Sequence, residues 1–117
     1  MDSEELKRRT KDFAIRIVRL ANALPRGRVG DSIGHQLLRC GTSVGANYRA
    51  ACHARSKADF ISKMGIVEEE ADECGYWIEL LVDLRLVTAS RIAGLLEGAS
   101  ELVSIAAASG RTARRNV

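Results

Sequence analysis

Hydrophobic residues recur along the chain at the three- and four-residue spacing of amphipathic α-helices, and no segment alternates as a β-strand does. The first helical segment begins at Asp2 or Ser3, either of which can cap it, and it is stopped by Pro25 and Gly27. Its large apolar residues share one face and are Leu6, Phe13, Ile17, Leu20 and Leu24. A second segment extends from about residue 31 to about residue 55, after a short loop.

The third segment holds the longest uninterrupted helical pattern. Ser56 caps it, its apolar residues repeat by four and three, and it extends to about residue 85. The fourth segment begins at Thr88 or Ser90 and ends at Gly110. Four such helices with short connections predict an all-α fold, an antiparallel up-down four-helix bundle. We expect residues 1–110 to form this single domain and residues 111–117 to form a flexible basic tail.

Two glycines interrupt the middle of the second segment. Gly41 and Gly45 are four residues apart, and each costs about 1 kcal/mol relative to alanine in a helix interior. Glycine is favoured where another backbone must come close, so this face predicts tight packing against a helix or a subunit. The alternative is a phosphate-binding loop, which would need a preceding strand and a lysine that this segment lacks.

Composition narrows the class of protein. The 117 residues are 46% hydrophobic and 28% charged, as is typical of one folded domain. The acidic N-terminus has no apolar signal region, and no apolar run approaches the ~20 residues that cross a bilayer. Three widely spaced cysteines form no disulfide framework. We therefore expect a cytoplasmic protein that does not contact membranes.

Charge is divided unevenly along the chain. Residues 1–58 hold twelve basic and five acidic residues, whereas residues 59–117 hold six basic and ten acidic ones. This division predicts a basic surface that binds a polyanion, or complementary faces on neighbouring subunits. The side chains that we expect to contact RNA or DNA phosphates are Arg16, Arg19, Arg39, Arg49, Arg55 and Lys57. The alternative is a solvated face, partly neutralised by the acidic residues 68–73.

The sequence pattern gives little support for a catalytic site or a metal site. The acidic residues 68–73 point in several directions around one helix and do not converge on a metal ion. The spacing of His35, Cys40, Cys52 and His53 matches no zinc module. No oxyanion hole or orienting group marks a cysteine–histidine nucleophile. We therefore expect a non-enzymatic protein with no catalytic residue, metal, cofactor or small-molecule substrate.

Trp77 belongs to a second apolar stripe on the third segment, together with Leu80 and Leu84. Two stripes give one helix more apolar surface than a single core needs, which favours oligomerisation. The alternative is that the stripes contact different helices of the same bundle. Together with the Gly41 and Gly45 face, Trp77 is therefore a candidate packing or subunit interface.

Three stretches of the chain resemble one known family. They are residues 34–51 (GHQLLRCGTSVGANYRAA), residues 56–63 (SKADFISK) and residues 70–81 (EADECGYWIELL). With Phe13 and Leu24-Pro25 in the first segment, the resemblance covers nearly the whole chain. The family is that of the bacterial four-helix-bundle proteins encoded by intervening sequences in 23S ribosomal RNA genes.

The resemblance implies fold and assembly more than activity. The family is similar to accessory proteins of diversity-generating retroelements, which form barrel-like homopentamers, bind nucleic acid and associate with a reverse transcriptase. By resemblance we expect a ring-like homopentamer that binds nucleic acid, with a scaffold that docks a protein partner as the alternative. No catalytic residues come with the resemblance, and the positions it carries over are structural: Gly41, Ser43, Gly45, Asn47, Phe60, Tyr76 and Trp77. The chain departs from the family pattern at Cys40, Gly65 and Gly75.

Overall fold

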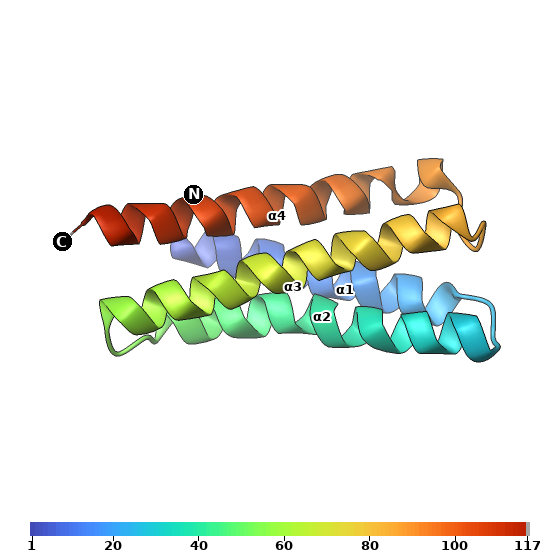
Figure 1. Cartoon of the computed structure of the whole chain (residues 1–117), viewed down its shortest axis with the longest axis horizontal. Helices are drawn as coiled ribbons and strands as arrows, with labels where there is room; N and C mark the ends of the chain where they lie inside the picture. The colour runs from blue at the N-terminus through green and yellow to red at the C-terminus, as the bar shows by residue number, and fades with distance from the viewer. Residues whose placement is uncertain (117) are drawn as a thin grey trace.

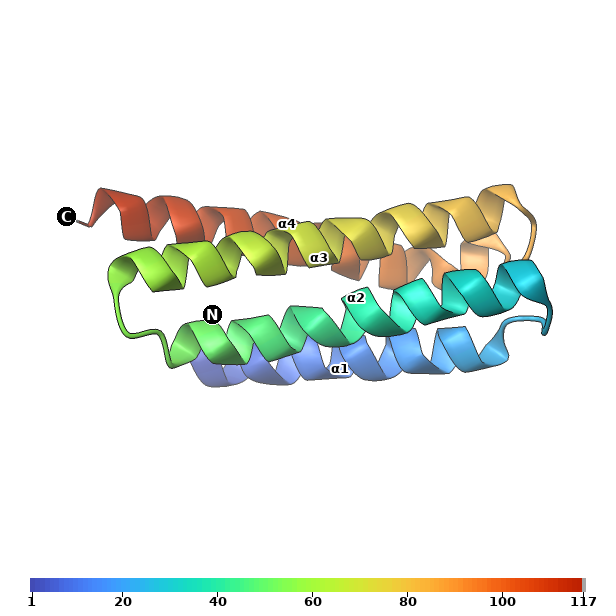
Figure 2. The same cartoon turned by 60° about the horizontal axis from the view of Figure 1, so that its bottom comes forward.

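Four helices make up the structure, a computed structural model that describes residues 1–116 (Figure 1). They are α1 (Ser3–Ala23), α2 (Arg28–Cys52), α3 (Lys57–Asp83) and α4 (Ala89–Arg115), and no strand occurs within residues 1–116. Successive helices run antiparallel in an elongated bundle of 49 × 22 × 20 Å (Figures 1 and 2). The predicted all-α architecture of four helices is therefore confirmed.

The helices are neighbours in chain order. α1 packs along α2, α2 along α3 and α3 along α4, whereas α1 and α4 contact each other more sparsely. α1 and α3 consequently lie diagonally across the bundle. The sparse seam between α1 and α4 leaves room at the surface for pockets that both helices line.

The core is mainly aliphatic, and every helix supplies one stripe of it. The stripe of α3 follows the predicted spacing and consists of Met64, Val67, Ala71, Cys74, Ile78 and Leu81. Two aromatic side chains, Phe13 and Tyr48, are buried, and Trp77 packs half-buried against the core. Burial of one large aliphatic side chain stabilises the fold by roughly 1.5–3 kcal/mol, so these stripes hold the helices together.

Side-chain caps begin two of the helices as predicted. Asp2 Oδ1 accepts a hydrogen bond from the Glu5 backbone N–H at 2.8 Å. Ser56 Oγ accepts one from the Asp59 backbone N–H at 3.0 Å. Each bond satisfies a backbone donor that has no partner inside the helix.

α2 begins at Arg28, earlier than the predicted start near residue 31. The reason is Gly27, whose φ of 141° lies in the region that favours glycine and lets the chain turn sharply after Pro25. The turn brings Gly30 so close to Pro25 that a Cβ at residue 30 would lie 2.1 Å from the proline carbonyl oxygen. Glycine at residues 27 and 30 thus allows the early start.

Two helix ends also differ from the sequence prediction. α2 ends at Cys52, before the expected residue 55. α4 continues through Gly110 to Arg115, so the prediction that Gly110 ends it is wrong, and residues 111–115 of the expected tail are helical. Arg114 and Arg115 favour this extension because cations complement the negative end of the helix dipole. Val117, the last residue of the predicted tail, lies outside the described residues.

α4 is, within residues 1–116, the one helix long and apolar enough to cross a membrane by length and composition. The core helix of a bundle passes the same criterion. The buried stripe of α4 packs into the core and consists of Ile92, Leu95, Ala99, Leu102, Ala106 and Gly110. Its exposed positions include the charged residues Arg91, Glu97 and Glu101, as on an amphipathic helix.

Candidate nucleic-acid interface

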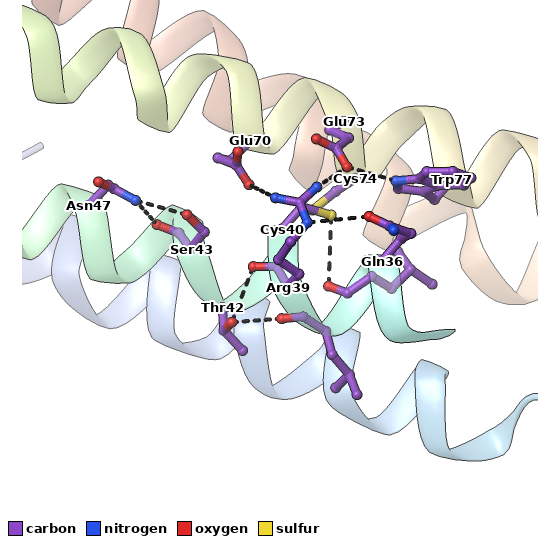
Figure 3. A network of polar contacts seen from close by, with 12 residues as sticks. Gln36, Arg39, Cys40, Thr42, Ser43, Asn47, Glu70, Glu73, Cys74 and Trp77 are labelled. Carbon is purple, nitrogen blue, oxygen red and sulfur yellow. Dashed lines mark hydrogen bonds and ion pairs between the residues drawn. The ribbon is translucent and has the colours of Figure 1, made fainter. Parts of the chain in front are cut away.

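Arg39 projects from α2 toward α3 and is held there by a polar network (Figure 3). Its guanidinium forms ion pairs with Glu70, at 3.0 Å, and with Glu73, and its Nε donates to Gln36 Oε1 at 3.3 Å. Trp77 Nε1 donates a further hydrogen bond to Glu73 at 2.9 Å. The hydrogen bonds from Trp77 and Arg39 lower the pKa of Glu73, and the bond to Glu73 raises the pKa of Arg39.

This network neutralises the charge of Arg39 at the surface between α2 and α3. Two carboxylates of the acidic segment 68–73 form ion pairs with Arg39. This agrees with the alternative interpretation, in which the acidic segment partly neutralises the basic face. The ion pairs are partly exposed, and water and salt screen the attraction between such charges. A phosphate that approaches Arg39 therefore meets a guanidinium whose charge two carboxylates already balance.

Arg49 lines a groove between α1 and α2, which we call the α1–α2 groove, with a volume of about 520 Å³. Its other basic side chains are Lys7, Arg8 and Lys11 of α1, and His53 also lines it. Glu4 is the one carboxylate among the described lining residues, and it pairs with Lys7 at 3.2 Å. Four cations thus surround a groove that holds one paired acid.

Helical spacing explains how the α1–α2 groove arises. Lys7 and Lys11 are four residues apart on α1, and Thr42, Ala46, Arg49 and His53 follow steps of four and three on and just after α2. Small side chains at residues 14, 45 and 46 keep the groove open. The polar stripe expected on the second segment is therefore divided, with Arg39 in the network and Arg49 in the groove.

Arg16 and Arg19 lie toward the other end of α1, where they line a different pocket. Arg85, in the turn between α3 and α4, and Arg91, on the first turn of α4, line the same pocket. We call these four side chains the arginine pocket. Arg85 and Arg91 are not predicted from the sequence, because they lie in the acidic half of the chain and only the fold brings them to Arg16 and Arg19.

Arg55 and Lys57 lie at the connection between α2 and α3 and line neither the α1–α2 groove nor the arginine pocket. Lys57 Nζ donates to the backbone carbonyl of Asn116 at the end of α4. Arg55 is exposed. The six candidate arginine and lysine residues therefore do not form one continuous site.

Gly41 and Gly45 face α1 of the same chain. A Cβ at residue 41 would lie 2.5 Å from Ile17 Cγ2, and one at residue 45 would lie 3.3 Å from Thr10 Oγ1. Thr10 is itself buried, and its hydroxyl donates to the carbonyl of Leu6 at 3.0 Å. The close approach of α1 and α2 within one chain thus explains this pair of glycines.

The cysteines and histidines do not come together as a metal site. Within residues 1–116, no three side chains of the histidine, cysteine, aspartate and glutamate types gather around one point. Cys74 Sγ lies 3.1 Å from Cys40 Sγ, and both thiols are fully buried. The hydrogen bond to Cys40 and burial raise the pKa of the Cys74 thiol, which keeps it protonated. His35 and His53 are exposed.

A larger groove of about 850 Å³ lies between α3 and α4. Its lining includes apolar residues such as Val82, Ile92 and Leu96, and four carboxylates, those of Asp72, Glu79, Asp83 and Glu97. Tyr76 also lines it and is 58% exposed, with its ring edge-on to that of Trp77 at 5.1 Å. An exposed aromatic beside apolar residues is typical of a protein-binding surface, whereas the carboxylates suit only a partner of complementary charge.

Comparison with known proteins identifies one family. The family model of the 23S rRNA-intervening sequence protein matches residues 3–108. A crystal structure of a protein of unknown function from the S23 ribosomal protein family of Bacteroides thetaiotaomicron has a TM-score of 0.84 and 34% sequence identity. The similarity covers 95% of this chain and 99% of that one. A comparison with curated proteins found no significant match.

Proposed function

Because this chain belongs to the 23S rRNA-intervening sequence protein family, we propose that it is a non-enzymatic protein that binds the phosphate backbone of RNA or DNA. The observation that supports the proposal is the α1–α2 groove, in which Lys7, Arg8, Lys11 and Arg49 surround a single paired carboxylate. Cations arranged in this way release counterions when they bind phosphates, and this release drives binding that does not depend on base sequence.

Backbone contacts are favoured over base stacking. Tyr48, the aromatic residue nearest in sequence to Arg49, is buried with 6% exposure and is unavailable to a base. The exposed Tyr76 belongs to the acidic α3–α4 groove, which repels phosphates. Single-strand binding by stacking needs exposed aromatics among cations. We therefore expect similar affinity for strands of different sequence.

The proposal includes self-assembly, with the homopentamer of the resemblance as the expected form. The apolar α3–α4 groove with its carboxylates suits a protein surface that carries complementary charge. A second copy of the chain offers such charge on α1. Cytoplasmic localisation remains part of the proposal, as does a protein partner that docks on the assembly.

The experiment that tests nucleic-acid binding is a salt series. Protein stripped of bound nucleic acid is titrated with a mixed-sequence RNA and the matched DNA at several salt concentrations. Four phosphate contacts predict a slope of log affinity against log salt of about −3 to −4. The absence of binding even at low salt would contradict the proposal and favour the protein-docking scaffold.

Matched variants identify the surface that binds. The double variant Lys11→Gln/Arg49→Gln should weaken binding to all sequences and reduce the salt slope by about one unit for each lost contact. Lys63→Gln, on α3 and outside the groove, is the control that should change neither quantity. An unchanged slope in the double variant would remove the α1–α2 groove from the proposal. Light scattering after size exclusion measures the number of subunits.

A further inference from the structure

The arginine pocket lies at one end of the bundle, between α1, the α3–α4 turn and the start of α4. Its volume is about 550 Å³, and pockets of roughly 300–1,000 Å³ typically hold small molecules. Besides the four arginines, its apolar lining includes Leu20, Leu24, Leu86, Val87, Ile92 and Leu95. The pocket therefore combines concentrated positive charge with a surface suited to an apolar or planar group.

No ion pair balances the positive charge of the pocket within residues 1–116, although Arg16 also lines the neighbouring α1–α4 pocket, which contains Asp12 and Glu97. None of the described lining residues is acidic, and none of the four arginines makes an ion pair there. Other arginines do find carboxylates, since Arg9 pairs with Glu101 and Arg39 with two glutamates. Like charges that cluster without a counter-ion oppose folding. An anionic ligand would relieve this repulsion.

Arg85 gives independent support, because its backbone is in an unusual conformation. Its φ of 61° is the one positive value of a non-glycine residue within residues 1–116. At the end of α3, the Arg85 N–H donates to Val82 and the Leu86 N–H donates to Leu81, both at 2.9 Å. Glycine is the usual residue at this position of such a helix end. The chain thus has a strained arginine lining the pocket where glycine would be more stable.

We infer that the arginine pocket binds the phosphate monoester of a nucleotide, either free or at the end of a nucleic-acid strand. A monoester carries a charge of about −1.5 to −2 at pH 7 and presents three strong acceptor oxygens. Planar guanidinium groups match these oxygens in bidentate pairs. The apolar lining contacts the sugar and base. The choice of a nucleotide over other phosphate monoesters rests on the proposed function.

Two titrations separate the two sources of the phosphate. A short RNA with a 5′-phosphate is compared with its 5′-hydroxyl twin by fluorescence anisotropy, with the label at the 3′ end. AMP is compared with adenosine by calorimetry. We expect the phosphate to strengthen binding at least about tenfold in one or both pairs, because charge-assisted hydrogen bonds form only with the monoester. A preference for the phosphorylated ligand in only one of the two pairs shows whether the pocket binds a strand end or a free nucleotide.

Variants link the preference to the pocket without depending on a destabilised protein. Arg85→Gly removes one guanidinium and relieves the left-handed strain, so the melting temperature should stay or rise while the phosphate preference falls about tenfold. Arg91→Gln should cause a similar loss. Arg111→Gln, at the opposite end of α4, is the control that should keep the full preference.

Two results would overturn the inference. One is wild-type protein that shows neither a 5′-phosphate preference nor binding of AMP. The other is an unchanged preference in both Arg85→Gly and Arg91→Gln. Failure of both RNAs to bind while AMP still binds would have a different meaning, because it would remove the proposed backbone binding and keep the pocket as a nucleotide site.

Discussion

Replacing Gly41 by alanine tests the close contact between α1 and α2. The added Cβ would lie 2.5 Å from Ile17 Cγ2 and 2.8 Å from Ile17 Cβ, well inside contact distance. Ile17 is fully buried and β-branched, so it cannot turn away into solvent. Overpacking of this kind costs about 1–3 kcal/mol, and the better helix propensity of alanine offsets about 1 kcal/mol. With contacts this short, we expect a net loss of about 1–2 kcal/mol.

Gly65→Ala is the matched control for this experiment. Gly65 also lies inside a helix, but nothing lies within 4 Å of the Cβ that alanine would add. The substitution therefore keeps the gain in helix propensity and adds no clash. We expect Gly65→Ala to stabilise the protein by about 0.5–1 kcal/mol.

Urea unfolding followed by circular dichroism measures both free energies of unfolding. The two variants and the wild type are compared at one protein concentration, because apparent stability depends on concentration in any protein whose subunits associate. A change of 1 kcal/mol corresponds to about 4 °C in melting temperature for a chain of this size. If Gly41→Ala is at least as stable as the wild type, the argument from close helix packing is wrong.

Three further predictions concern side chains that are paired, hydrogen-bonded or buried in the fold. Arg39→Gln should leave RNA affinity unchanged and change stability little, as measured by anisotropy and urea unfolding. A clear loss of affinity would mean that Arg39 binds phosphate despite its two carboxylates. Trp77→Phe should raise the pKa of Glu73 toward its ordinary value of 4.5, which an NMR titration measures. Because the wild-type pKa is lowered, the stability gained from this carboxylate is complete above pH 4.5 and is lost as the pH falls through the lowered value. The part of the stability difference that comes from Glu73 should therefore vanish in acid, and the part that comes from packing of Trp77 should remain. A thiol reagent should react first with the half-buried Cys52, and with Cys74 only after the protein unfolds. Fast reaction of Cys74 in the folded protein would contradict its burial.

The fold could be predicted from the sequence wherever local chemistry decides it. The caps at Asp2 and Ser56 and the apolar stripe of α3 depend on residues close in the chain, and the structure has them as expected. The start of α2 was missed because it depends on the left-handed φ of Gly27. Gly110 was misread as a stop, since glycine ends a helix only if the chain turns there, and α4 continues.

The candidate site was less predictable, because it depends on which helices become neighbours. Charge counting found the basic half of the chain, but it could not tell that Arg39 meets Glu70 and Glu73 across α2 and α3. It also had no signal for Arg85 and Arg91, which join the pocket through the α3–α4 turn. One feature of the sequence does point to Arg85: it follows the third helix at the position where a helix that ends in a tight turn usually has glycine.

The topology of the bundle explains why the acids of α3 do not neutralise α1, on which Lys7 and Arg9 pair with Glu4 and Glu101 and four other basic side chains make no ion pair within residues 1–116. α1 carries six basic and three acidic residues, and α3 carries eight acidic and two basic ones. An up-down arrangement puts these two helices diagonally across the core, so their side chains do not neutralise each other, and the acids of α3 reach α2 instead. The proposed contacts of these basic side chains of α1 are two, one with phosphate and one with the acidic face of another copy. Both weaken with salt, but only the second makes RNA compete with assembly. Scattering measured with and without RNA therefore distinguishes them, because dissociation of the oligomer by RNA would mean that subunit contacts use α1.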